Sequence, residues 1–273
     1  MRADEDAMKR RATRIALVLL VAITVAVAVA VIPRATNLGA PFPDETSSGV
    51  PSGTTLTPSA ALDIRRAGTV IEGLDIDGCV DVRADNVTIR RSRITCARPT
   101  TAVRLFDGNH GLTLEDVEIN GSGVVSTAVG FSNYTLRRVD IHDVIDGPRL
   151  GTNTTIQDSY VHGLVRAEGS HNDAVQVTGG SDILIRHNTL DAYSESTGDL
   201  FNAAIMIGSS SAPVANVLIE DNYLDGGNYT VNFHPGLTAT GIVGRNNVFG
   251  PHFRYGSLAR GGVSGVEWSG EPN

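Results

Sequence analysis

The sequence has little of what a helical or a nucleic-acid-binding protein needs. Helix formers do not dominate its 273 residues, while Gly, Thr, Val, Ile and Asn are common, which favours strands joined by tight turns. Lysine and arginine number 22 against 30 acidic residues, and the net charge of −8 argues against a general nucleic-acid binder, which shows a clustered basic surface. The two cysteines permit at most one disulfide bond.

One long hydrophobic run is present near the N-terminus. Residues 15–32 are apolar except for Thr24, and the basic segment 1–14 precedes them. Because basic flanks remain in the cytoplasm, we expect the rest of the chain to be exported and extracytoplasmic. An uncleaved membrane anchor and a signal peptide cleaved at Ala28-Val29-Ala30 both fit the run. Residues 33–55, rich in Pro, Gly, Ser and Thr, are predicted to be a flexible linker.

Internal repeats organise residues 56–250. In each repeat an apolar residue is followed five positions later by another, and the spacing between repeats varies from 18 to 34 residues. Such a variable period, without a helical stripe, predicts a parallel β-solenoid. A strict six-residue period, typical of the left-handed hexapeptide type, is absent. The pairs are Ile71/Ile76, Ile89/Ile94, Leu114/Ile119, Leu136/Ile141, Ile156/Val161, Ile185/Leu190, Ile219/Leu224 and Val243/Val248.

Aligning the repeats on the first residue of each pair, position 0, sorts the side chains into columns. Positions −2, 0, +3 and +5 are predicted to face inward, with a bend between +1 and +3. Position −3 holds Asn, Asp or Gly in seven of the eight repeats, as a turn with positive φ requires. At position +3 we expect a ladder of Asn188, Asn222 and Asn246. Charges at positions +1 and +2 alternate in sign and are interpreted as ladders of the scaffold.

The sequence allows two structures for the pair of cysteines and two for the C-terminal segment. Cys79 and Cys96 are 17 residues apart, close to the 18-residue spacing of the repeats that carry them. We therefore expect them on adjacent coils, either as a disulfide, which oxidising conditions allow, or as two buried thiols. Residues 251–273, which include Trp268, follow the last repeat and either cap the solenoid or trail from it.

The repeat strings and the asparagine ladder resemble the right-handed parallel β-helix proteins of the pectate-lyase-like (pectin lyase fold) superfamily, over roughly residues 60 to 250. The fold class this implies is all-β, a right-handed parallel β-helix of about eight coils, here preceded by an N-terminal hydrophobic helix. The superfamily includes polysaccharide lyases, glycoside hydrolases, epimerases, phage tailspikes and non-catalytic surface proteins. The resemblance implies that the substrate groove lies on the outward face of the first sheet.

Polar residues on the strands of this first sheet are left unexplained by the ladders. Asp146 and Asp173 stand on successive coils, so we expect their carboxylates to lie close together and to bind Ca²⁺. The longest insertions are expected to wall the groove, with His171 and His234 near it. They span residues 163–173 and 192–203. One outward column is predicted to contain Arg83, Arg104, Val129, Arg149, Gln176, Met206 and Asn232.

The leading hypothesis is an exported, carbohydrate-active β-helix that acts on an acidic, uronate-containing polysaccharide. In a lyase, Arg149 or His171 would remove the proton α to the uronate carboxyl, with Asp173 also catalytic. The candidacy of Arg149 comes from superfamily lyases that use an arginine on this sheet. In a hydrolase, Asp146 and Asp173 would be the acid–base pair, but the aspartate-rich pattern of the β-helix polygalacturonases is absent. The predicted substrate-binding residues are Arg83, Arg104, Gln176, Asn232 and His234.

A non-catalytic protein is the alternative hypothesis. The hydrophobic run 15–32 and the small number of coils favour a surface-anchored β-helix that binds glycan or serves as a structural or adhesive module. A polysaccharide is the expected partner of either protein, and the run 15–32 is the expected membrane contact if it stays uncleaved.

Overall fold

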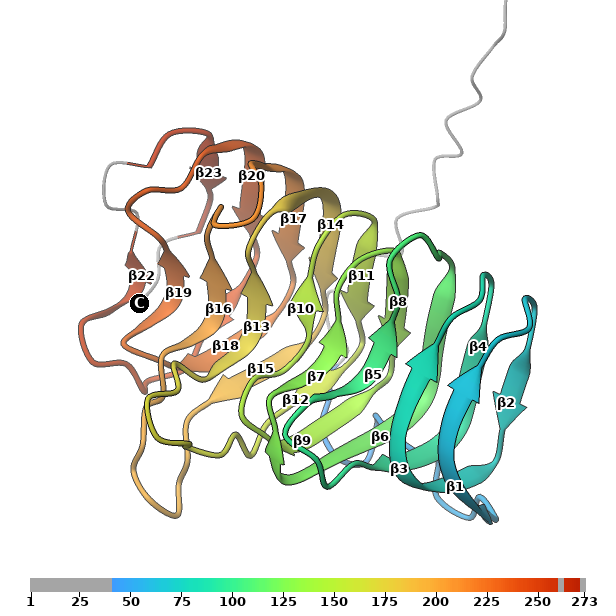
Figure 1. The fold of residues 1–273 in the computed structure, drawn as a ribbon. Coiled ribbons are helices and arrows are strands. Elements are labelled where there is room, and N and C mark those ends of the chain that lie inside the picture. Colours follow the sequence, from blue (N-terminus) through green and yellow to red (C-terminus); the bar gives the residue numbers. More distant parts are fainter. Residues whose placement is uncertain (1–40, 260–262, 271–273) are drawn as a thin grey trace, which may run out of the picture. The chain divides into compact units, whose positions relative to one another are not determined.

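The computed structural model describes residues 41–259 and 263–270 (Figure 1). The predicted basic flank, the expected hydrophobic helix and residues 33–40 of the predicted linker lie outside the described residues. Within the described residues, no helix is long and apolar enough to cross a membrane. Their regular structure consists of strands, so the described fold is all-β.

The chain winds as a right-handed parallel β-helix with three faces (Figure 1). Neighbouring coils pair in parallel, and several long strands bend from one face onto the next. The first face contains the ends of β1 (Thr57–Ile64) and β3 (Leu74–Val82), then β5 (Thr101–Leu105), β7 (Thr127–Gly130), β10 (Arg149–Leu150), β13 (Asp173–Val177), β16 (Ala203–Ile207), β19 (Tyr229–Phe233) and β22 (Gly256–Ala259).

The other two faces follow the first along each coil. The second face contains β2 (Val70–Glu72), the starts of β4 (Thr88–Thr95) and β6 (Leu112–Val125), β8 (Tyr134–Arg137), β11 (Thr154–Gln157), β14 (Gly180–Arg186), β17 (Val214–Glu220), β20 (Ala239–Arg245) and β23 (Val266–Trp268). The third face contains the starts of β1 and β3, the later parts of β4 and β6, β9 (Asp140–Val144), β12 (Tyr160–Val161), β15 (Thr189–Ala192), β18 (Tyr223–Gly226) and β21 (Val248–Phe249).

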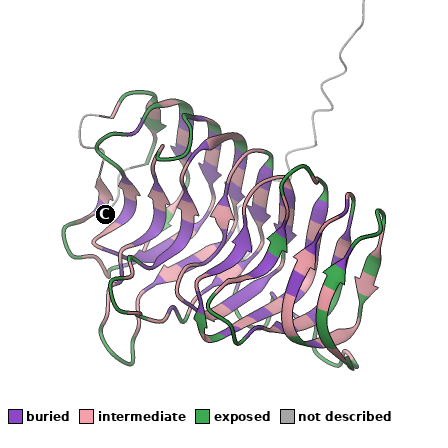
Figure 2. Cartoon of the chain, viewed as in Figure 1, coloured by how far each residue is buried: buried purple, intermediate pink, exposed green. Residues whose placement is uncertain are grey.

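The predicted inward column on the second face is confirmed over most of its length. Consecutive residues of the column are register partners, beginning with Ile71 and Ile89 and ending with Ile185 and Ile219. From Ile89 onward these side chains are fully buried, and buried residues recur from coil to coil beyond the first in Figure 2. Axial stacking of apolar side chains therefore supplies the core of the fold.

The bends of the coil fall where the columns predict them. Left-handed backbone at position +2 turns the chain from the second face to the third, and left-handed backbone at position −3 starts the second face. The first set is Gly73, Arg91, Asp116, Arg138, Asp158, His187, Asp221 and Asn246. The second set is Gly68, Asn86, Gly111, Asn133, Asn153, Asp182, Asn216 and Gly241.

The last repeat is aligned differently from the prediction. Gly244, and not Val243, is the register partner of Ile219, and Phe249 is the partner of Leu224. The ring of Trp268 occupies the space that a side chain at position 244 would fill, so glycine is required there. The pair Val243/Val248 is therefore wrong by one residue.

The asparagine ladder has the same shift, and its third member is Asn247 instead of Asn246. Asn188 donates from Nδ2 to Oδ1 of Asn222, and Asn222 donates from Nδ2 to Oδ1 of Asn247, both over 2.9 Å. Asn188 and Asn222 are fully buried. Each also donates to a backbone carbonyl of the preceding coil, so the ladder satisfies polar groups that water does not reach.

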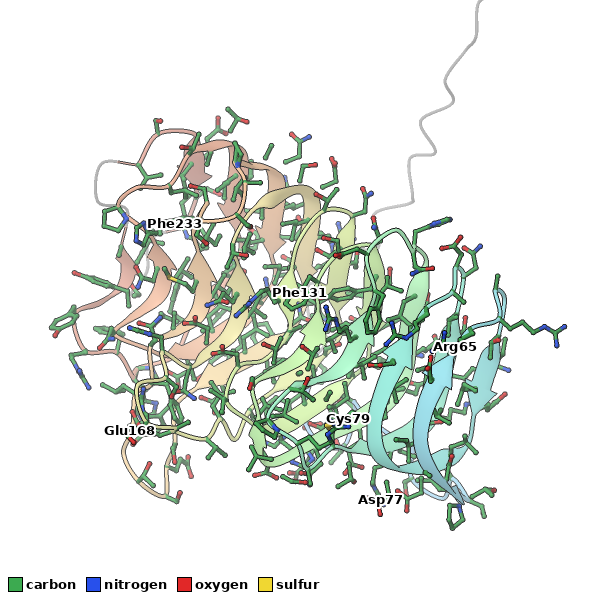
Figure 3. All side chains as sticks on the ribbon, viewed as in Figure 1. Arg65, Asp77, Cys79, Phe131, Glu168 and Phe233 are labelled. Atoms are coloured by element: carbon green, nitrogen blue, oxygen red, sulfur yellow. A yellow bond between two sulfur atoms is a disulfide. The ribbon has the colours of Figure 1, made fainter. Side chains whose placement is uncertain are left out.

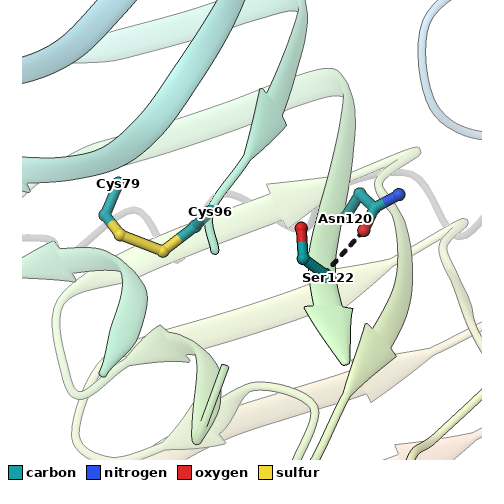
Figure 4. The surroundings of a disulfide bond; sticks show 4 residues. All are labelled: Cys79, Cys96, Asn120 and Ser122. Carbon is teal, nitrogen blue, oxygen red and sulfur yellow. Dashed lines mark hydrogen bonds between the residues drawn. A yellow bond between two sulfur atoms is a disulfide. The ribbon is translucent and has the colours of Figure 1, made fainter. Parts of the chain in front are cut away.

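A disulfide joins two N-terminal coils, and the first described segment packs against later coils. Cys79 and Cys96 are bonded, which selects the disulfide over two buried thiols (Figure 4). Residues 41–49, inside the predicted linker, lie against the outside of the second and third faces. The Phe42 ring is 5.7 Å from that of Tyr223, and the backbone N of Gly49 donates to the carbonyl of Arg138 over 2.9 Å.

Candidate functional site

Register on the first face places four partly exposed side chains in one outward row. The row contains Arg149 on β10, Gln176 on β13, Met206 on β16 and Asn232 on β19. Because neighbouring strands lie about 4.8 Å apart, the row presents one side chain per coil along the helix axis. It combines one positive charge, two amides and a thioether, a mixture suited to a long polar ligand.

The first part of the predicted column is wrong. Val129 is buried, and Gly130 is the register partner of Arg104. On its other side Arg104 is paired with Asp81, while Arg83 lies just beyond the end of β3. The number of residues between the turn and the first-face strand differs between coils, so a fixed offset does not identify the outward side chain.

Asp173, the first residue of β13, has a fully buried side chain. Its Oδ1 accepts a hydrogen bond from Nδ2 of Asn202 (2.7 Å), and its Oδ2 accepts one from Nε2 of Gln176 (3.0 Å). Burial raises the pKa of Asp173 from 3.8 to about 8, although the bond from Asn202 opposes the rise. The carboxyl of Asp173 is thus enclosed by two side-chain amides and helps to position Gln176, and its catalytic role stays a prediction.

Asp146 and Arg149 lie beside this carboxyl. Oδ1 of Asp146 accepts a hydrogen bond from the backbone N of Asp173 (3.0 Å), and Oδ2 lies 3.9 Å from Nη2 of Arg149. Burial raises the pKa of Asp146. The backbone hydrogen bond from Asp173 and the positive charges of Arg149 and His171 act to lower it. His171 is exposed and lies in the loop that leads into β13.

Two aromatic residues that the sequence analysis did not single out hold Arg149. Its guanidinium carbon lies 5.6 Å from the ring centre of Phe131, which Figure 3 labels on the first face. The buried hydroxyl of Tyr134 donates to the backbone carbonyl of Arg149 over 2.8 Å. Tyr134 was recognisable, because it is the aromatic residue at the inward position −2. Nε of Arg149 is buried and makes no hydrogen bond within the described residues.

The oxygen atoms of Asp146 and Asp173 do not form a suitable ligand set for Ca²⁺, which takes six to eight oxygen ligands. Both oxygens of Asp173 already accept N–H bonds from side-chain amides, and Oδ1 of Asp146 accepts a backbone N–H. Among residues 41–259 and 263–270, no three His, Cys, Asp or Glu side chains are grouped so as to hold a metal ion. The predicted metal-binding roles of these two carboxylates are therefore not supported.

Two long loops stand beside this group of residues and are tied to each other. Arg166 donates from Nε and Nη2 to the carboxylate of Asp199 over 2.9 and 2.7 Å. The fully buried Asn172 donates from Nδ2 to two backbone carbonyls over 2.7 Å each. Since His171 immediately precedes Asn172, these contacts limit where its imidazole lies. The loops span residues 162–172 and 193–202.

A shallow cavity of about 240 Å³ adjoins the row. His234 lies in it, and its Nδ1 accepts the backbone N–H of Gly236 over 3.1 Å. Gln176 and His234 therefore share one cavity, whereas Asn232 is outside it. The cavity is lined by Gln176, Val177, Thr178, Met206, Gly208, Ser209, Ser210, His234 and Gly236.

Arg83 and Arg104 lie apart from this group. They line a second depression, of about 490 Å³, on the N-terminal coils. From Arg104 on β5 to Gln176 on β13 the first face crosses β7 and β10, a separation of about 14 Å at the usual strand spacing. The residues predicted to bind substrate together are thus divided between two places on the first face.

Comparison with known proteins gives little. No protein-family model and no curated protein matches the chain. Among solved structures, the A-module of the Azotobacter vinelandii mannuronan C-5 epimerase AlgE6 is similar, with 14% sequence identity and a TM-score of 0.47. The match covers 75% of this chain and 65% of that module, which is less than two thirds of the module's length.

Proposed function

We propose that this β-helix binds an acidic, uronate-containing polysaccharide along the first face and cleaves it as a lyase. The observation that carries the proposal is the approach of Arg149, in the outward row, to Asp146, with the exposed His171 in the loop that leads into β13. The partly exposed guanidinium of Arg149 suits a sugar carboxylate, since arginine pairs with carboxylates through directed hydrogen bonds. The row from Gln176 to Asn232 would hold the adjoining sugar units.

The chemistry assigns each residue one task. With Arg149 paired to the uronate carboxylate, His171 takes the proton from the carbon α to that carboxyl, since imidazole is a common general base in enzymes. The electron pair of that C–H bond forms a carbon–carbon double bond, and the β carbon–oxygen bond to the leaving sugar breaks. Asp146 gives its proton to the leaving oxygen, a role that suits a carboxyl whose pKa is raised by burial.

The test measures cleavage and binding separately with the purified full-length protein. Uronic-acid polymers are incubated with the protein, and unsaturated product is followed by its ultraviolet absorbance. His171→Gln is expected to abolish product formation while polymer binding persists. Arg149→Gln is expected to weaken polymer binding at least tenfold. Arg137→Gln, which removes an exposed arginine of the second face, is the matched control.

The outcomes separate the lyase from its rivals. Binding that depends on Arg149, without product on a broad polymer panel, would support the non-catalytic glycan binder. Saturated product would indicate hydrolysis, and an intact polymer with changed sugar configuration would indicate epimerisation. Equal weakening of binding in Arg149→Gln and Arg137→Gln would remove the proposed site.

A protein that acts on a polysaccharide must also be in a cellular compartment that contains one. We propose that the β-helix is extracytoplasmic, since the bond between Cys79 and Cys96 is of a kind that persists in oxidising compartments. Protease added to intact cells is expected to degrade the β-helix. Resistance of the β-helix in intact cells, with digestion after lysis, would place it inside.

A further inference from the structure

The depression on the N-terminal coils contains charged groups that the proposed function does not use. We propose that it is a separate binding site for a carboxylate- or sulfate-bearing ligand, formed around Arg98 and Arg104. The proposal depends on this depression alone and not on the lyase site. It is lined by Ala61, Leu62, Asp63, Cys79, Asp81, Arg83, Arg98, Thr100, Thr101, Arg104 and Phe106.

One aromatic ring organises the arginines. The guanidinium carbon of Arg83 lies 3.5 Å from the ring centre of Phe106, and that of Arg104 lies 4.4 Å from the same centre. Two cations held by one ring repel each other, and an anion bound near them would relieve that repulsion. Stacking also restricts two long side chains before any ligand arrives, which lowers the entropy cost of binding.

The arginines differ in what already neutralises them. Arg83 donates from Nη2 to Asp81 over 2.9 Å, and its Nε lies 3.4 Å from Asp63. Arg98 and Arg104 are both exposed, and neither forms an ion pair with any described residue. Arg83 is therefore held in place by its ion pairs and supports the site. The charges of Arg98 and Arg104 are available to a ligand.

The chain around Arg98 is constrained where it enters the depression. The disulfide from Cys79, which lines the depression, holds Cys96 two residues before Arg98 (Figure 4). After it, the backbone N of Thr100 donates to the carbonyl of Arg98 over 2.8 Å. Thr100 and Thr101 add hydroxyl donors, so the depression offers charge and hydrogen bonds to an oxyanion.

Calorimetry on the full-length protein tests the site with three probes: inorganic sulfate, a carboxylated oligosaccharide and a sulfated oligosaccharide. The double variant Arg98→Gln/Arg104→Gln is expected to lose at least tenfold in affinity for one of the oligosaccharides. The matched control, Arg90→Gln/Arg137→Gln, removes two exposed arginines of the second face and is expected to bind as the unmodified protein does. Retained circular dichroism shows that each variant is folded.

The probes distinguish the two sources of the anion. Preference for the carboxylated or for the sulfated oligosaccharide identifies the ligand class. No binding of any probe would overturn the proposal, as would equal loss in the control, which would show non-specific charge attraction. Because Arg149 and His171 are unchanged in the double variant, failure of this site leaves cleavage intact, and failure of the lyase leaves this binding intact.

Discussion

Gln176 donates a hydrogen bond from Nε2 to the buried Oδ2 of Asp173, three residues earlier on the same strand. Oε1 of Gln176 is itself buried and without a partner in the described residues. If the Gln176 side-chain amide flips, so that Oε1 faces Asp173, a protonated Asp173 carboxyl would donate the hydrogen bond that Oε1 lacks. This fits a carboxyl whose pKa is raised to about 8 by burial, and it links the protonation of Asp173 to the outward row.

The first prediction concerns the pH dependence of stability. Asp173 has an ordinary pKa of 3.8 and a pKa of about 8 in the fold, so the unfolded chain ionises first as pH rises. The favourable contribution of the neutral group is complete below the lower value and is lost as pH rises through the upper one. Asp173→Asn, which stays neutral, is expected to gain stability relative to the unmodified protein between about pH 4 and pH 8.

Urea denaturation at several pH values measures this difference. Asp182→Asn, on an exposed turn of the second face, is the matched control and should show no comparable trend. A constant difference between Asp173→Asn and the unmodified protein across this range would show that Asp173 is ionised in the fold.

The second prediction concerns the asparagine ladder. In Asn222→Ala, the ladder loses donors to Asn247 and to the carbonyl of Ile185, and Asn188 loses its acceptor. Because these groups are buried, we expect the free energy of unfolding to fall by about 2–4 kcal/mol, as measured by urea denaturation. Gln157→Ala, which removes a partly exposed amide on β11, should change it by less than about 1 kcal/mol. Similar losses in the two variants would mean that the ladder contributes no special stability.

The third prediction concerns Glu220, a buried carboxylate on β17. Burial acts to raise its pKa, but hydrogen bonds from Arg245 and Arg186 reverse this, and the net pKa is lowered. A lowered pKa stabilises the fold above the ordinary value of 4.5, and the stabilisation is lost as pH falls through the folded value. Glu220→Gln is therefore expected to be destabilising at neutral pH and less so in acid. Thermal unfolding across this range measures the effect, and a loss independent of pH would contradict it.

The architecture was predictable because a solenoid repeats each physical requirement once per coil. Apolar residues at position 0 stack, and Asn or Gly recurs at position −3 because that backbone needs positive φ. The alignment of the last coil was not predicted correctly, because Gly244 makes room for Trp268, a residue that follows the repeats in the sequence. A repeat pattern does not encode the side chain that covers its end.

The candidate site was less predictable because its geometry depends on loops and coil lengths. The sequence places Asp146 and Asp173 on successive coils, and the structure brings them together. The sequence does not reveal that Asn202 and Gln176 enclose Asp173 and thereby remove its carboxyl from solvent. Nor does it reveal the offset of Arg83, since that depends on where β3 ends.

The fourth prediction concerns the tie between the two long loops. Arg166 and Asp199 form a paired hydrogen bond, although the arginine side chain is 43% exposed, so solvent screens the ion pair. We expect Arg166→Ala to increase amide hydrogen exchange in residues 163–172 by about three- to fivefold, because a surface pair of good geometry contributes up to about 1 kcal/mol. Exchange in β13 should not change, since its hydrogen bonds lie within the first face. Arg137→Ala is the control for loss of an exposed arginine and should leave both segments unaffected. Unchanged exchange in the loop of Arg166→Ala would mean that Asn172 alone fixes the position of His171, and that the neighbouring loop plays no part in forming the site.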